Sequence, residues 1–111
     1  MHDLKERRRF PRAHSRFPMR YRLIPVGDEG YFHASVEDLS PDGVRFRCAG
    51  SVRPRTGLLF ELQLPGAEAV RSFGRAAWVR ELPGRGGFEV GGTFVDQSTS
   101  TRRAIEQHIG G

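Results

Sequence analysis

The chain has 111 residues and a formal net charge of +5. This length suits one domain with a single modest core, and a hydrophobic fraction of 37% excludes a chain that is disordered throughout. Arginine supplies all but one of the 18 basic residues, which suits an anionic partner because the guanidinium fork fits phosphate oxygens. A GC-rich genome would give the same bias, so both explanations stay open.

The single cysteine and the N-terminal composition set further limits. Cys48 has no second cysteine to pair with, which excludes an intrachain disulfide and a cysteine-based metal framework. The first ten residues lack the apolar core of a signal peptide, and no stretch approaches transmembrane length. We therefore expect a cytoplasmic protein without membrane insertion.

Residues 1–13 are polar and basic, and Pro11 interrupts any helix there. We expect a flexible arm over residues 1–13 and one folded domain over residues 14–111. The arm contains the heptapeptide ERRRFPR, whose arginines are Arg7, Arg8, Arg9 and Arg12. Such a charge run is usually a solvated arm, and this interpretation remains open beside a ligand-binding role.

Alternation of apolar and polar residues with period two dominates the rest of the chain. The six segments with this pattern are residues 19–24, 32–39, 44–48, 59–64, 70–82 and 88–95. Their expected inward-facing residues are Met19, Tyr21, Leu23, Val44, Phe46, Cys48, Phe60, Leu62, Leu64, Phe88, Val90 and Phe94. Turn sequences separate the segments, and six short strands at this spacing predict an antiparallel barrel or sandwich.

Two irregularities are expected near the end of the domain. Residues 70–82 are long for one strand, and Gly74 is the expected position of a β-bulge. After residue 97 the period changes, with Ser98 to Ser100 as candidate N-caps and with Ile105 and Ile109 one helical turn apart. We expect one short C-terminal helix that covers an open end or edge of the barrel.

Enzyme signatures are absent from the sequence. There is no phosphate-binding glycine loop, no nucleophile elbow, and no metal-ligand spacing among the histidines. Glu37 and Asp38 are adjacent on one expected strand, so we expect their carboxylates on opposite faces, where they could not cooperate as an acid–base pair. The sequence therefore favours a protein that is not an enzyme and that carries neither a metal nor a cofactor.

Two short motifs remain. Arg8 and Arg12 form an R-x-x-x-R pair in the arm, and residues 38–43, DLSPDG, read D-x-S-x-x-G. The second motif alone is typical of a type I turn, with Pro41 in the second position and Gly43 in the fourth. Together, in this order and on a six-stranded pattern, the two motifs resemble those of PilZ domains. The resemblance extends to AWVRELPGRGGFEVGGTFVD near the end, and it covers residues 6 to 109.

This resemblance implies an all-β fold, a six-stranded antiparallel barrel with a flexible N-terminal arm and one short C-terminal α-helix. It also implies a bacterial receptor for the second messenger cyclic di-GMP. The residues that it assigns to the ligand are Arg7, Arg8, Arg12, Asp38, Ser40 and Gly43. Arg7, directly before the R-x-x-x-R pair, matches the form that in this family goes with two stacked ligand molecules per site. The resemblance would allow motility, exopolysaccharide synthesis or pilus assembly as outputs, and the sequence identifies neither the output nor the downstream protein.

The residue types suit this ligand. Arginine can grip phosphate oxygens or the O6/N7 edge of guanine, and an ionised Asp38 can accept from guanine N1–H and N2–H. Ser40 can donate or accept beside it, and Gly43 permits close approach because it has no Cβ.

Three further residues have two interpretations. Trp78 is expected to pack under the terminal helix, and the alternative is a place near the ligand. Arg45 and Arg47 would extend the positive site or would lie on a solvated strand face. Arg9 is a further candidate contact of the ligand.

Two other functions compete with the receptor. One is a PilZ-like adaptor that binds proteins and no nucleotide. The other is a basic barrel that binds nucleic acid, which would need aromatic side chains exposed on one strand face. Nucleic acid is not the expected partner, because the aromatic residues alternate with arginines as core residues do.

Overall fold

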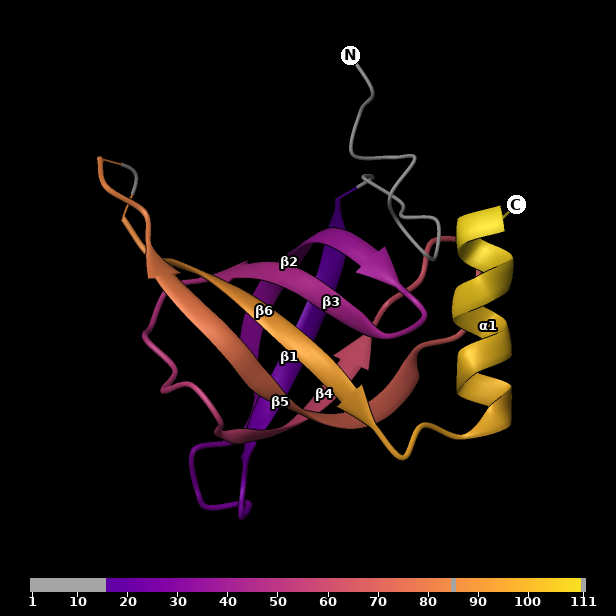
Figure 1. Ribbon diagram of the computed structural model, residues 1–111, viewed down its shortest axis with the longest axis horizontal. Coiled ribbons are helices and arrows are strands. Elements are labelled where there is room, and N and C mark those ends of the chain that lie inside the picture. Colours follow the sequence, from indigo (N-terminus) through magenta and orange to yellow (C-terminus); the bar gives the residue numbers. More distant parts are fainter. Residues whose placement is uncertain (1–15, 85, 111) are drawn as a thin grey trace.

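The alternating segments form a closed antiparallel barrel in the computed structural model, which describes residues 16–84 and 86–110 (Figure 1). Around the barrel the strands follow the order β1-β2-β3-β6-β5-β4. The elements are β1 (Phe17–Ile24), β2 (Phe32–Ser40), β3 (Gly43–Cys48), β4 (Gly57–Leu62), β5 (Val70–Glu81), β6 (Phe88–Val95) and α1 (Thr99–Gly110). The prediction of a six-stranded barrel with one C-terminal helix is confirmed. The expected arm lies outside the described residues.

The barrel interior is filled by the residues that the alternation assigns to it. Phe46 and Phe60 are fully buried, and their rings meet edge to face at 6.0 Å between centroids. Tyr21 packs on one side of this pair at 5.4 Å from Phe46, and Phe94 on the other at 5.7 Å from Phe60. Leu64 is also buried, although β4 ends at Leu62. Aromatic packing thus runs through the middle of the barrel.

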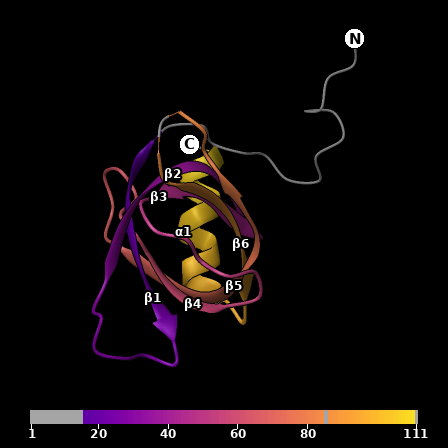
Figure 2. The same cartoon turned by 90° about the vertical axis from the view of Figure 1, so that its left-hand side faces the viewer.

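The terminal helix lies across one end of the barrel. It contacts β2 and β5, which are opposite one another in the closed strand order, and it is seen behind the barrel in Figure 2. Ser98 Oγ accepts a hydrogen bond from the backbone N–H of Thr101 at 3.1 Å, which is an N-cap, and Ile105 is fully buried. The expected helix, its serine cap and its place at a barrel end are confirmed. No helix of residues 16–84 and 86–110 is both long and apolar enough to cross a bilayer.

Two β-bulges interrupt the register, and neither lies at Gly74. In β5 the pairing with β6 is regular at Gly74 and shifts between Ala76 and Trp78, so the expected bulge position is wrong by about three residues. In β2 the pairing with β3 shifts between Val36 and Asp38. A bulge adds one residue to one strand of a pair, so it reverses the face on which all later side chains of that strand lie.

Gly74 is needed for packing rather than for a bulge. A Cβ atom at this position would lie 2.0 Å from the carbonyl oxygen of Thr93 and 2.7 Å from Cε2 of Phe60. Neither the β6 backbone nor the fully buried Phe60 ring can move without disturbing the barrel. The glycine therefore allows β5 and β6 to pair around a bulky core residue.

Replacing Gly74 by alanine should therefore lower the free energy of unfolding by about 1–3 kcal/mol, as overpacking of a core does. Gly50→Ala is the matched control, because a Cβ there has nothing within 4 Å. Urea unfolding followed by tryptophan fluorescence measures both variants. Equal stability of the two variants would show that the Gly74 contact is unimportant.

Candidate functional site

The bulge in β2 places two neighbouring carboxylates on the outer face of the barrel. Val36 faces inward opposite Phe46, whereas Asp38 pairs with Arg45, which faces outward. Glu37 is the extra residue, and its carboxylate reaches the outward-facing Arg47. The expectation that Glu37 and Asp38 lie on opposite faces is wrong because the bulge breaks the alternation between them.

Arg45 holds the aspartate of the D-x-S-x-x-G motif. Its Nε and Nη2 lie 2.8 Å and 2.6 Å from Oδ2 of Asp38, and its Nη1 contacts Oε2 of Glu89. Glu89 in turn accepts from Arg80 through its other oxygen. Asp38 and Glu89 are each only 5% exposed. Two nearly buried carboxylates are therefore neutralised by arginines of the same outer face.

The charges around Arg45 also fix its protonation. Partial burial lowers the pKa of Arg45, but hydrogen bonds and attraction from Asp38 and Glu89 outweigh it, so the pKa lies above its ordinary value. Arg45 is therefore a permanent cation at the centre of this face.

The β2–β3 turn carries the rest of the motif. Ser40 pairs with Gly43 across the two-residue connection, and Ser40 Oγ accepts from the backbone N–H of Asp42 at 3.3 Å. Neither Pro41 nor Asp42 has a positive φ. This fits a type I turn, in which both central residues have negative φ. A Cβ at Gly43 would lie 2.3 Å from the carbonyl oxygen of Gly92. The absence of a side chain at Gly43 therefore permits the close approach of β3 and β6.

Trp78 lies on the outer face and not under the helix. The β5 bulge turns it outward opposite Gly91, and it is 41% exposed. A Cβ at Gly91 would lie between 2.2 and 2.9 Å from three indole atoms, so the ring lies over this glycine. The expected packing under the helix is wrong, because Trp78 instead lines the same outer hollow as Asp38 and Ser40.

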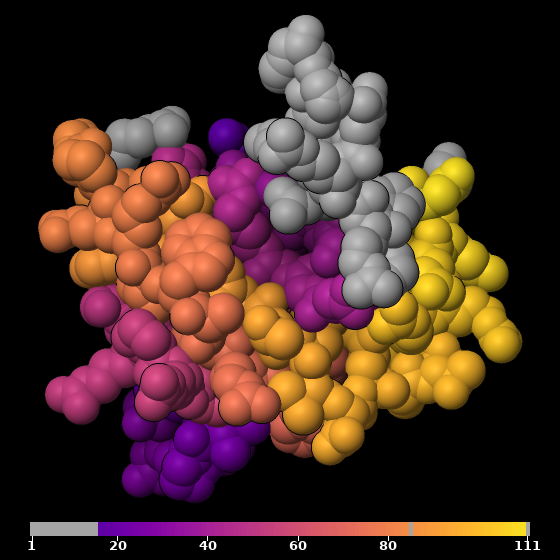
Figure 3. Space-filling view, in the orientation of Figure 1, coloured from indigo at the N-terminus to yellow at the C-terminus, as the bar shows by residue number. Residues whose placement is uncertain are grey.

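These residues form one row across four strands. Asp38 pairs with Arg45, Arg45 with Gly91, and Gly91 with Trp78. A hollow of about 330 Å³ lies over this row. It is lined by Asp38, Ser40, Asp42, Gly43, Val44, Arg45, Ala77, Trp78, Gly91, Gly92 and Thr93. In Figure 3 the magenta β2–β3 segment is set back between the orange β5–β6 segments and the yellow helix.

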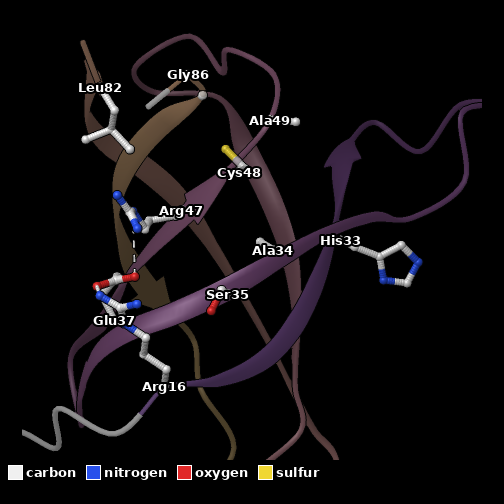
Figure 4. Close-up of a pocket in the computed structure, with 11 residues that line it drawn as sticks. Arg16, His33, Ala34, Ser35, Glu37, Arg47, Cys48, Ala49, Leu82 and Gly86 are labelled. Atoms are coloured by element: carbon white, nitrogen blue, oxygen red, sulfur yellow. Dashed lines mark ion pairs between the residues drawn. The ribbon is translucent and has the colours of Figure 1, made fainter. Parts of the chain in front are cut away.

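A larger hollow of about 650 Å³ lies on the other side of Glu37 (Figure 4). There Glu37 forms ion pairs with Arg16 at 3.4 Å and with Arg47 at 3.7 Å. Leu82 and Gly86 line the opposite wall of this hollow (Figure 4). Arg47 therefore belongs to this second hollow, whereas Arg45 belongs to the motif. We take the smaller hollow as the candidate site because Asp38, Ser40 and Gly43 all line it.

Most residues of this site are among those predicted from the sequence. Asp38, Ser40, Gly43, Arg45 and Trp78 line one hollow, while Arg7, Arg8, Arg9 and Arg12 lie outside the described residues. Sequence reasoning missed Glu89, Arg80 and Gly91. The glycine pair at 91–92 was the available signal for a ring packed on β6, because glycine inside a strand often marks close approach.

The terminal helix is tied to the motif turn. Arg102 of α1 donates to the carbonyl oxygen of Pro41 at 3.4 Å and lies 3.7 Å from the carboxylate of Asp42. At its other end the helix meets the start of β1, where Phe17 and His108 pack edge to face at 5.3 Å. The helix therefore contacts both the β2–β3 turn and the start of β1.

Comparison with known proteins decides the family. The sequence profile of the PilZ domain matches residues 6–111. The chain belongs to the PilZ domain family. PilZ domains are non-enzymatic receptors, and the family typically binds cyclic di-GMP. No curated protein sequence matches the chain.

Solved structures similar to this PilZ domain include three from bacteria. The inhibitor of motility MotI/DgrA from Bacillus subtilis has a TM-score of 0.76 at 14% identity, over 93% of this chain and 49% of that one, so this chain spans about half its length. The PilZ domain of YcgR from Escherichia coli with c-di-GMP gives 0.71 at 14%, over 93% and 88%. The PilZ domain of CeSA from a cellulose-synthesizing bacterium gives 0.63 at 14%, over 88% and 93%. At these identities the likeness shows the fold alone.

Removing Arg45 tests how far the charge network supports the barrel. Arg45→Met leaves Asp38 and Glu89 nearly buried without their shared cation, and should lower the free energy of unfolding by about 1–3 kcal/mol. This is less than for a fully buried pair, because a third of the Arg45 side chain is exposed. Arg47→Met, which loses one 3.7 Å contact, is the matched control, and urea unfolding measures both. An equal loss in the two variants would contradict the network.

Proposed function

We propose that this PilZ domain is a cyclic di-GMP receptor that converts ligand binding into a changed surface for a downstream protein. The ligand would lie over the hollow of the D-x-S-x-x-G motif. The arginines of the arm would contact the same ligand. The observation that carries this proposal is the convergence of Asp38, Ser40, Gly43 and Arg45 on one outer hollow beside an exposed indole.

Arg16, which directly precedes β1 and lines the larger hollow, contacts the sequence neighbour of the motif aspartate. Arg16 Nη2 lies 3.4 Å from Oε1 of Glu37, the residue directly before Asp38. Arg12 precedes Arg16 by four residues, a length that spans at most about 14 Å when extended. Arg12 therefore has the reach to contact a ligand over the motif hollow, and Arg8 reaches twice as far.

The chemistry of the hollow matches a guanine nucleotide. A carboxylate accepts from guanine N1–H and N2–H, and arginine donates to phosphate oxygens or to guanine O6 and N7. Asp38 supplies the first group and Arg45 lies 2.6 Å from it, so a bound base would share Asp38 with Arg45. The Trp78 indole offers a ring on which a purine can stack. Adenine does not present the same donor pair, which predicts selectivity for the guanine messenger.

Calorimetric titration with cyclic di-GMP measures affinity and stoichiometry together, with cyclic di-AMP as the selectivity control. Arg8→Ala, Arg12→Ala and Asp38→Asn should each weaken binding about ten- to a hundredfold, because each removes a charge-assisted hydrogen bond. Two ligand molecules per protein would support the stacked form associated with Arg7.

Arg103→Ala is the matched control for the loss of an arginine, because Arg103 is exposed on α1 and does not line the hollow. It should bind like the unaltered protein. If the unaltered protein binds neither dinucleotide at high micromolar concentration, the receptor proposal is wrong and the protein-binding adaptor takes its place.

Ligand binding should order the arm, because phosphates would neutralise arginines that otherwise repel one another. Hydrogen–deuterium exchange should slow at residues 5–13 on saturation with cyclic di-GMP. Residues 26–30, which do not line the motif hollow, serve as the internal control and should exchange unchanged. Unchanged exchange of the arm at saturating ligand would rule out this switch.

A further inference from the structure

The outer face of β5 combines arginines and aromatic rings along one strand. Its outward-facing residues before the bulge are Arg71, Phe73 and Arg75, and those after it are Trp78 and Arg80. Phe73 is 56% exposed and Trp78 is 41% exposed. The expectation that the aromatic residues face the core is therefore wrong for these two. Without the bulge between Ala76 and Trp78, the indole would point inward.

This face is positively charged because its carboxylates are each shared by two arginines. Glu61 accepts from both Arg20 and Arg71, and Glu89 contacts both Arg45 and Arg80. Hydrogen bonding to Arg20 outweighs partial burial and holds the pKa of Glu61 below its ordinary value, so this carboxylate stays ionised and remains paired.

Arg75 lies between the two rings along the strand, and its cross-strand partners are uncharged. Its cross-strand partners are Gly57 on β4 and Thr93 on β6. Phe73, by contrast, has the half-buried Leu59 and Val95 as its partners. A guanidinium flanked by small neutral residues and set between two exposed rings can contact a phosphate while the rings contact bases.

We propose that the outer face of β5 binds single-stranded nucleic acid, with bases stacked on Phe73 and Trp78 and backbone phosphates at Arg75. The proposal is independent of cyclic di-GMP binding, although the two sites share Trp78. Single strands fit and duplexes do not, because the bases of a duplex are already stacked on one another. The linear order of arginine, ring, arginine, ring and arginine favours a linear polyanion over the compact apolar centre of a protein interface.

Fluorescence anisotropy with labelled 12-nucleotide oligo(dT) and oligo(U) tests this proposal on the full chain. Both probes should bind at low salt, and the affinity should fall linearly with salt on logarithmic axes. Phe73→Ala should weaken binding about 5- to 150-fold, the loss of one stacked base. Arg75→Ala should also weaken binding and should make the salt slope shallower.

The controls separate stacking from charge. Phe32→Ala removes another exposed ring, one that packs on Tyr21 away from β5, and should leave oligonucleotide binding unchanged. Phe73→Ala should bind cyclic di-GMP like the unaltered protein, whereas Asp38→Asn should keep its oligonucleotide affinity. If the protein does not bind cyclic di-GMP, the oligonucleotide measurements therefore still test the β5 proposal.

Three results would overturn the proposal. The first is no binding of either oligonucleotide at low salt. The second is binding that Phe73→Ala does not weaken, which would indicate charge attraction alone. The third is equally tight, Phe73-dependent binding of polyglutamate, which would indicate an acidic protein partner instead.

Discussion

The outer face of the barrel depends on Arg45, a cation shared by two nearly buried carboxylates. Asp38 comes from β2 and Glu89 from β6, so the guanidinium joins the strands on both sides of β3. This sharing holds the carboxylate of the motif aspartate in place. It also means that any ligand of Asp38 must be accommodated beside Arg45, which favours a partner that carries both hydrogen-bond donors and negative charge.

Small residues of β6 let large rings pack on both of its sides. Gly91 has the Trp78 indole over its outer side, and Gly92 has the Phe60 ring against its inner side, 2.7 Å from where a Cβ would be. The same pair of adjacent glycines thus serves the core and the candidate site. Substitution there would affect stability and surface together, which makes the exposed Phe73 the better position for separating function from folding.

Much of the fold could be predicted from the sequence, because alternation and turn residues report local backbone structure directly. The core residues Phe46 and Phe60 and the Ser98 cap are of this kind. The faces of Asp38 and Trp78 could not be predicted in the same way. Each follows a bulge, whose position depends on pairing with another strand, and a shift of one residue turns later side chains to the opposite face. The ion pair between Asp38 and Arg45 follows from the β2 bulge and was missed with it.

The most direct test of the site is a nuclear magnetic resonance titration of the ¹⁵N-labelled protein with cyclic di-GMP. The largest shifts should occur at the backbone amides of Asp38, Ser40, Gly43 and Arg45 and at the indole Nε1–H of Trp78. Shifts confined to Ala34, Ala49 and Leu82, which line the hollow on the other side of Glu37, would contradict this prediction. So would a spectrum that does not change at saturating concentrations of the messenger.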